Sequence, residues 1–176
     1  MKIEILEEAG FKWAMEGLAR SYNQKAENMP EVALKLANKD GGHNKFLESI
    51  VVWLNISAPR FFWSEFDTYR VGMTKQSDST MHTLKRRPLR QSDFEYSIPA
   101  LILSTVNQFI EGYNAPIDEL KNILPDGFIQ GRSVCTNYKV IRHIIIQRHN
   151  HKLPQWRYFC EKMKELKYYD YLGLNL

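Results

Sequence analysis

The sequence predicts a helix-rich α+β fold, and three observations support this prediction. The chain has 176 residues, of which 44% are hydrophobic, and this is enough for a sizeable core. Apolar residues recur at helical spacing in most segments, whereas only Met1–Leu6 and Ile50–Ile56 have the pattern or composition of strands. No internal repeat and no linker interrupts the chain, so we expect a single domain over residues 1–176.

The sequence predicts two strands, one long loop and several helices. Met1–Leu6 alternates apolar and polar residues, and Ile50–Ile56 is rich in β-branched residues and reads as a buried strand that Pro59 ends. The polar segment Val71–Arg90 is expected to be a long irregular loop. Apart from the helix discussed next, helices are predicted for Phe11–Tyr22, Pro30–Asn38, Arg60–Tyr69, Ile98–Tyr113, Ile117–Ile123 and Gln155–Lys167.

One further helix, between Asn137 and Arg148, is the most informative. Positions 137, 141, 144 and 148 share one face, so Asn137 and Arg148 bracket Ile141 and Ile144 over roughly 16 Å. An amide and a guanidinium beside an apolar seam are costly unless each finds a partner. A planar anion, a nucleobase edge or a flavin ring would be such a partner. The alternative is that Asn137 caps the helix and Arg148 pairs with an acidic side chain of the same protein.

The charge balance argues against nucleic-acid binding. The chain carries 24 Lys and Arg against 20 Asp and Glu, a net charge of only +4. The one basic run, Lys85–Arg90, contains four cations in six residues, and it could contact phosphates or form a solvated loop.

Other classes of site are weakly supported. Cys135 and Cys160 lack the spacing of a metal site, and His149 and His151 have no nearby carboxylate or cysteine, so no metal is predicted. P-loop, GxGxxG and Ser-His-Asp patterns do not occur. No apolar run has the length of a membrane span and the first residues lack a signal-peptide profile, so we expect a cytoplasmic protein.

The order of several sequence blocks resembles the flavin-dependent thymidylate synthases (ThyX). The blocks that carry the resemblance are Gly42–Glu48, Ala58–Phe61, Leu124-Pro125, Thr136–Lys139, Arg148 and Gln155-Trp156. The family signature, Arg-His-Arg followed by a serine, an Asn-Glu pair, a second serine and an Arg-Tyr pair, is degenerate here in residues 66–82. Arg70 stands for the last arginine of the triplet and Ser77 or Ser79 for the second serine, whereas the other signature residues have no clear counterpart.

The resemblance implies a single ThyX-like domain, helix-rich with a small central antiparallel sheet, and a set of site residues. Arg148 would hold and polarise the pyrimidine, which suits a guanidinium that donates to a uracil carbonyl. The residues implied to contact FAD are His43, Arg70, Asn137, Lys139 and His143. The residues implied to hold the nucleotide phosphate lie in the loop from Lys75 to His82, and they are Lys75, Ser77, Ser79 and Thr80.

The resemblance therefore implies transfer of a one-carbon unit to C5 of a deoxyuridylate-type nucleotide. Members of the family use FAD, NADPH and methylenetetrahydrofolate to methylate dUMP, and they assemble as homotetramers with sites shared between subunits. The loss of signature arginines keeps an alternative open: a non-catalytic nucleotide-binding protein on the same scaffold.

Overall fold

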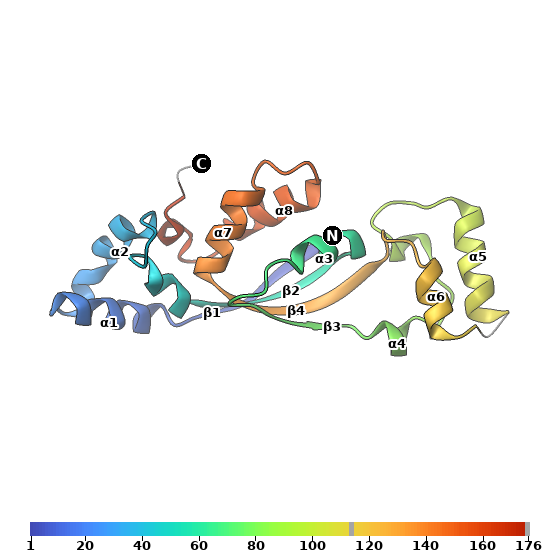
Figure 1. Ribbon diagram of the computed structural model, residues 1–176, viewed down its shortest axis with the longest axis horizontal. Coiled ribbons are helices and arrows are strands. Elements are labelled where there is room, and N and C mark those ends of the chain that lie inside the picture. The colour runs from blue at the N-terminus through green and yellow to red at the C-terminus, as the bar shows by residue number, and fades with distance from the viewer. Residues whose placement is uncertain (113–114, 175–176) are drawn as a thin grey trace. The chain divides into compact units, whose positions relative to one another are not determined.

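The computed structural model describes residues 1–112 and 115–174. Figure 1 shows the succession of strands and helices along the chain. The elements are β1 (Lys2–Ala9), α1 (Phe11–Tyr22), η1 (Ala26–Asn28), α2 (Met29–Ala37), η2 (Lys45–Ser49), β2 (Val51–Pro59), α3 (Arg60–Phe66), β3 (Thr74–Ser77), α4 (Thr80–Thr83), η3 (Gln91–Asp93), α5 (Ala100–Glu111), α6 (Ile117–Ile123), β4 (Ile129–Asn137), α7 (Tyr138–Arg148), α8 (Pro154–Met163) and η4 (Tyr169–Leu172).

The strands form one small antiparallel sheet in the order β1-β2-β4-β3. This arrangement confirms the predicted fold class, a helix-rich α+β protein with a small antiparallel sheet. The turn from β1 into α1 depends on Gly10, whose φ is +95°. A Cβ atom at Gly10 would lie 2.2 Å from the backbone oxygen of Ser49, so only glycine fits there.

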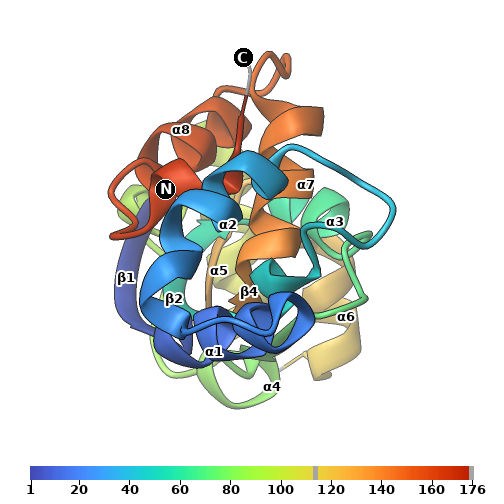
Figure 2. The same ribbon diagram turned by 90° about the vertical axis from the view of Figure 1, so that its left-hand side faces the viewer.

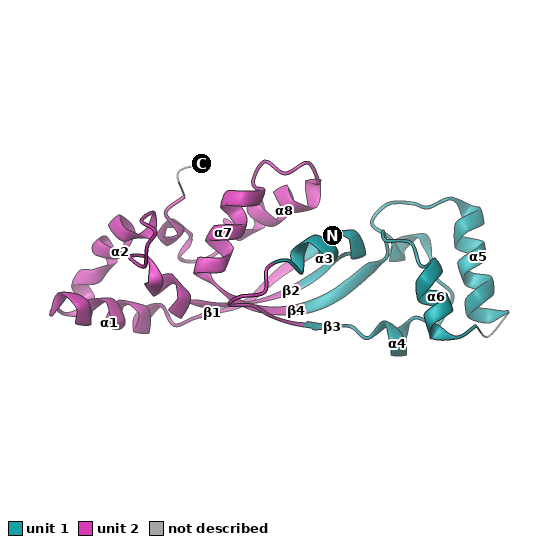
Figure 3. Cartoon of the chain, in the orientation of Figure 1, with its two compact units in different colours: residues 1–2, 56–68, 76–132 teal, residues 3–55, 69–75, 133–176 magenta. Residues whose placement is uncertain are grey.

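The chain folds into two compact units, each built from segments far apart in sequence (Figure 3). Unit 1 comprises Met1–Lys2, Ile56–Thr68 and Gln76–Arg132. Unit 2 comprises Ile3–Asn55, Tyr69–Lys75 and Ser133–Leu176. The chain passes from one unit to the other several times, so neither unit is a continuous stretch of sequence. The single domain over residues 1–176 stays a prediction.

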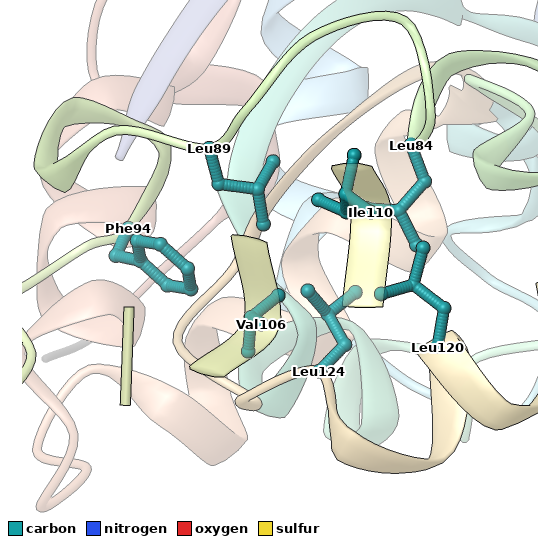
Figure 4. Close-up of a cluster of buried hydrophobic side chains, with 7 residues drawn as sticks. All are labelled: Leu84, Leu89, Phe94, Val106, Ile110, Leu120 and Leu124. Atoms are coloured by element: carbon teal, nitrogen blue, oxygen red, sulfur yellow. The ribbon is translucent and has the colours of Figure 1, made fainter. Parts of the chain in front are cut away.

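Unit 1 has its own hydrophobic core, drawn in Figure 4. Leu120 of α6 is fully buried in this core, and helix α5 contributes Val106 and Ile110. The complete cluster of buried residues is Leu84, Leu89, Phe94, Val106, Ile110, Leu120 and Leu124. Each large side chain buried in this way contributes about 1.5–3 kcal/mol relative to an exposed one.

Unit 2 is organised around α7. Helix α7 packs against α8, and α1 packs against α2 (Figure 2). Both α7 and α1 also pack against η2. Ile141 and Ile144, the apolar residues predicted to lie between Asn137 and Arg148, are fully buried. The amphipathic spacing read from the sequence is therefore correct for this helix.

Most predicted elements are confirmed, and their ends differ by a few residues. Phe11–Tyr22 and Ile117–Ile123 have the predicted bounds, and Pro59 both ends β2 and precedes α3. The helix predicted for Arg60–Tyr69 ends at Phe66, because Asp67 adopts the C-cap position. The helix predicted to end at Lys167 ends at Met163. The described part of α5 ends at Glu111, and Tyr113, the predicted last residue of that helix, lies outside the described residues.

Two strands were missed by sequence reasoning. The segment Val71–Arg90 is not an irregular loop throughout, since it contains β3 and the short helix α4. Strand β4 was not predicted because Gly131 and Arg132 interrupt its alternation, and only Val134 and Thr136 are buried. Within the described residues, no helix is long and apolar enough to cross a membrane.

Candidate functional site

Asn137 is the N-cap of α7. Its backbone is extended, with φ −132° and ψ 168°, and its Oδ1 atom accepts the backbone N–H of Val140 at 3.0 Å. This satisfies one of the backbone donors that a helix N-terminus leaves without a partner. The capping role considered from the sequence is therefore confirmed, and it occupies the oxygen end of the Asn137 amide.

The segment before β3 lies against the other end of this amide. A Cβ atom at Gly72 would lie 2.9 Å from Nδ2 of Asn137, and Gly72 has φ +70°. Both the close contact and the left-handed backbone conformation favour glycine at this position. Thr136 donates its hydroxyl to the carbonyl oxygen of Gly72 at 3.2 Å. Residues 69–75 are thus held beside the start of α7, although they are more than sixty positions away in sequence.

Arg148 is held at the other end of α7 by aromatic side chains. Its Nε–H donates to the hydroxyl of Tyr69 at 2.9 Å, and one terminal nitrogen lies 2.9 Å from Nε2 of His151. The guanidinium carbon lies 4.6 Å from the ring centroid of Trp156 and 5.7 Å from that of Tyr69, which are cation–π distances. Arg148 is half-buried, so the guanidinium is partly shielded from water.

The loop before η2 carries His43 and meets α7 through a charged cluster. Asn44 is fully buried, and its Nδ2 donates to the carbonyl oxygen of Ala37 at 3.0 Å. Lys139 donates to Oδ1 of Asn44, and its Nζ lies 3.8 Å from the carboxylate of Asp40. Because Asn44 directly follows His43, this cluster holds the His43 loop against the first turn of α7.

Arg142 belongs to the same cluster and was not recognised in the sequence. It is 9% exposed, it pairs with Asp40 at 3.5 Å, and its buried Nε has no hydrogen-bond partner among the described residues. A buried donor in this state costs free energy. The sequence offers only a weak signal, namely a cation one helical turn after Tyr138.

A hollow of about 590 Å³ lies beside His43 in unit 2. Apolar side chains such as Leu18 and Phe46 line it together with the polar groups of His43, Lys45 and Glu48. Gly17 of α1 leaves the helix backbone bare there, with no atom within 4 Å of a Cβ built on it. The lining residues are Ala14, Gly17, Leu18, Ser21, Tyr22, Leu36, Gly42, His43, Lys45, Phe46, Glu48 and Ser49. A hollow that combines apolar and polar lining groups has the chemistry needed to hold a cofactor.

The remaining cofactor residues predicted from the sequence also lie in unit 2. His143 is exposed on α7, with its ring centroid 6.1 Å from that of Tyr69 in an edge-on arrangement. Arg70 is exposed beside Tyr69. Lys75 donates to the carbonyl oxygen of Tyr69 at 3.1 Å. Unit 2 thus contains all the residues predicted to contact FAD, together with Arg148 and Lys75.

The hydroxyl residues predicted to hold a phosphate belong to unit 1. Ser77 and Ser79 are exposed, and Thr80 lines a second hollow of about 530 Å³ together with Arg86 and Arg87. The structure therefore does not place Ser77, Ser79 and Thr80 in the same compact unit as Lys75.

The basic run 85–90 is partly engaged inside unit 1. Both terminal nitrogens of Arg87 donate to the carboxylate of Asp93, at 2.7 and 2.6 Å. This hydrogen bonding lowers the pKa of Asp93 from its ordinary value. Arg86 donates its Nε–H to the carbonyl oxygen of His82 at 2.9 Å. Part of the run is thus tied to its own loop, and its binding to nucleic acid stays a prediction.

Metal ligands are not assembled in the part of the chain that is described. No three His, Cys, Asp or Glu side chains within residues 1–112 and 115–174 are grouped as a metal site. His149 places Nδ1 3.2 Å from the carbonyl oxygen of Ile145, and His151 contacts Arg148.

Comparison with known proteins gives a clear answer for the fold. No protein-family model matches the sequence, and no curated protein sequence matches it. Two solved structures of the flavin-dependent thymidylate synthase ThyX from Helicobacter pylori, both in complex with FAD and dUMP, match with TM-scores of 0.82 and 15% sequence identity. Each match covers 98% of this chain and 98% or 97% of the other. The fold is that of the flavin-dependent thymidylate synthases. At 15% sequence identity, the similarity to ThyX establishes the fold and does not establish the chemistry of the site.

Proposed function

We propose that this protein binds a deoxyuridylate-type pyrimidine nucleotide together with FAD and transfers a one-carbon unit to C5 of the base. The observation that carries the proposal is the guanidinium of Arg148, held between Trp156 and Tyr69 on a helix of the ThyX fold. The two similar structures contain FAD and dUMP, which supports the choice of ligands.

Arg148 has the chemistry needed at the base. A guanidinium presents N–H groups in a planar fork that matches a uracil carbonyl and its neighbours. Donation to that carbonyl stabilises the negative charge that develops on the ring when C6 is attacked. The Arg148 guanidinium lies over the Trp156 ring, 4.6 Å from its centroid, and this cation–π contact restrains the fork before the nucleotide arrives.

The residues of unit 2 also suit a flavin. The hollow of about 590 Å³ combines apolar side chains with the polar groups of His43, Lys45 and Glu48, and a flat ring system with polar edges needs both. We propose that His43, Asn137, Lys139, His143 and Arg70 contribute to holding FAD. When bound, FAD would accept and return the electrons that NADPH supplies for reduction of the one-carbon unit donated by methylenetetrahydrofolate.

Lys75, Ser77, Ser79 and Thr80 are proposed to hold the nucleotide phosphate. Family members build each site from several subunits, and we propose a homotetramer in which phosphate and base contacts come from different copies of the chain. The cytoplasmic location expected from the sequence stays a prediction.

A second candidate function is nucleotide binding without turnover. It is favoured by the residue at position 68. If Arg70 is the last arginine of the family triplet, the first arginine of the triplet is replaced here by Thr68. The hydroxyl of Thr68 donates to the carbonyl oxygen of Glu65 at 2.7 Å, so it caps helix α3 and offers no cation to a phosphate. In this alternative Arg148 still binds the base, and flavin chemistry is lost.

Spectroscopy and thermal shift of the purified protein separate the two functions. If the proposal is correct, the protein carries FAD, seen as visible absorbance that is released on denaturation, and dUMP raises its Tm. A colourless protein that dUMP stabilises, and that FAD does not, supports the non-catalytic alternative. If neither ligand moves the Tm, both functions are refuted, while the fold is unaffected.

A further inference from the structure

Tyr69 is a buried tyrosine bonded at both sides of its hydroxyl. It is only 8% exposed, although it directly precedes the exposed Arg70. Its hydroxyl oxygen accepts the Nε–H of Arg148 at 2.9 Å and lies 2.9 Å from Oε1 of Gln147. Since arginine can only donate, the tyrosine proton is directed to Gln147, and the direction of both hydrogen bonds is fixed.

The ring of Tyr69 adds a second constraint on the same arginine. It meets the ring of Trp156 edge-on, with centroids 5.8 Å apart and an interplanar angle of 71°. The guanidinium of Arg148 lies over Trp156 at 4.6 Å. The Trp156 ring therefore restricts movement of the guanidinium on one side, while the hydrogen bond from Nε to the Tyr69 hydroxyl restricts rotation about the bond that leads to Nε.

The backbone of Tyr69 is itself anchored. Its carbonyl oxygen accepts from Nζ of Lys75 at 3.1 Å. A few residues further on, Gly72 is held against the cap of α7 by the hydroxyl of Thr136. The Tyr69 side chain therefore approaches Arg148 from a segment that is tied to α7 at a separate point.

We propose that Tyr69 is the positioning residue for Arg148, and that its hydroxyl sets the orientation in which the guanidinium meets the carbonyl edge of the pyrimidine. The nucleotide part of this inference rests on the proposed function, whereas the immobilisation of Arg148 does not. A guanidinium fixed in advance spends less conformational freedom on binding, and its planar fork tolerates little angular error. Tyr69 does not touch the reacting atoms in this account.

The test compares Tyr69→Phe with Tyr158→Phe in the full chain. Both changes remove one phenolic oxygen, but Tyr158 is 43% exposed on α8 and serves as the matched control. The first readout is the hydrogen-exchange rate of the Arg148 Nε–H, followed by ¹⁵N NMR and assigned by its loss in Arg148→Lys. The second readout is the Kd for dUMP from calorimetry, measured alone and in the Arg148→Gln background.

Two results are expected. Exchange of the Arg148 Nε–H becomes about tenfold faster in Tyr69→Phe and stays unchanged in Tyr158→Phe, because one charge-assisted hydrogen bond has been lost. The Kd for dUMP rises about tenfold in Tyr69→Phe, and the same change has no effect once Arg148 is replaced by Gln. A purely structural role for Tyr69 would not produce this dependence on Arg148.

Each contrary result has one meaning. Unchanged Nε–H exchange in Tyr69→Phe overturns the positioning role, whatever the protein binds. Faster exchange with an unchanged Kd for dUMP overturns the claim that this orientation matters for the nucleotide. If the wild-type protein does not bind dUMP while exchange is accelerated as expected, the proposed function fails and the immobilisation of Arg148 by Tyr69 survives.

Discussion

Two substitutions of Asn137 separate the capping role of its amide oxygen from the cofactor role proposed for its amide nitrogen. Asn137→Ala removes the Oδ1 acceptor that satisfies the Val140 N–H at 3.0 Å, together with the Nδ2 donor beside Gly72. Asn137→Asp keeps an acceptor oxygen at the N-cap and replaces only the nitrogen end. The carboxylate also interacts favourably with the positive end of the dipole of α7.

The expected magnitudes follow from this geometry. Loss of an N-cap costs about 1 kcal/mol, within a range of about 0.5–2 kcal/mol, so Asn137→Ala should lower the Tm by roughly 2–4 °C in a chain of this length. Asn137→Asp should lie within about 0.5 kcal/mol of wild type, since aspartate caps helices as well as asparagine does. Both variants should bind FAD more weakly, because both lack the amide donor.

The assay pairs chemical denaturation with FAD titration of the same two variants. If Asn137→Asp is destabilised as much as Asn137→Ala, the capping argument is refuted, because the carboxylate would then fail to replace the amide oxygen. If the alanine variant binds FAD as the wild type does, the cofactor role of Asn137 is refuted while the cap stands.

Three further predictions concern stability and thiol chemistry. Leu120→Ala should lower the free energy of unfolding by about 2–5 kcal/mol in urea titrations, because Leu120 is fully buried in the unit 1 cluster; a loss below about 1 kcal/mol would show that this cluster is not a packed core. Burial raises the pKa of the Cys160 thiol to about 11, so at pH 8 a thiol reagent should modify the partly exposed Cys135 first, and faster labelling of Cys160 would contradict its burial. Hydrogen bonding to Arg87 lowers the pKa of Asp93, so this pair stabilises the fold at neutral pH, and its contribution is lost as the pH falls through the folded-state pKa of Asp93. In acid titrations the free energy of unfolding of Asp93→Asn should therefore decline less than that of the wild type. An unchanged acid profile would show that the pair does not contribute to stability.

The helices were predictable because their signals are local. In α1 and α6 the apolar spacing and the flanking turn residues lie within a few positions of the helix, so the sequence sets both bounds. In α7 the cap at Asn137 and the buried Ile141 and Ile144 repeat the helical period. Such features need no knowledge of distant segments.

Strand β4 was missed because a distant partner makes its polar residue compatible with the sheet. Arg132 interrupts the expected alternation, yet its guanidinium donates to both carboxylate oxygens of Asp67, at 2.8 and 3.0 Å, and lies 4.3 Å from the ring centroid of Trp63. These partners are some 65 positions away in sequence. Periodicity within a short window cannot reveal such compensation.

Residues of the candidate site were predictable only where the side chain itself, such as a guanidinium, indicates a binding role. Arg148 was identified from its place at the end of an apolar helical stripe, and its partial burial agrees with that reading. Tyr69 gave no comparable signal, because a tyrosine in an aromatic-rich stretch is usually core. The role proposed for Tyr69 rests on a hydrogen bond to Arg148 across 79 positions, which forms only after the chain has folded.

Calorimetric titration with dUMP measures whether Arg148 holds a pyrimidine nucleotide. The wild-type protein and Arg20→Gln, a control on the exposed surface of α1, should bind dUMP with the same Kd. Arg148→Gln should weaken binding by at least tenfold, because a charge-assisted contact to the base is worth about 1.5–3 kcal/mol. Equal affinity of wild type and Arg148→Gln would contradict the proposed function, since the guanidinium at the end of α7 would then have no part in holding a nucleotide.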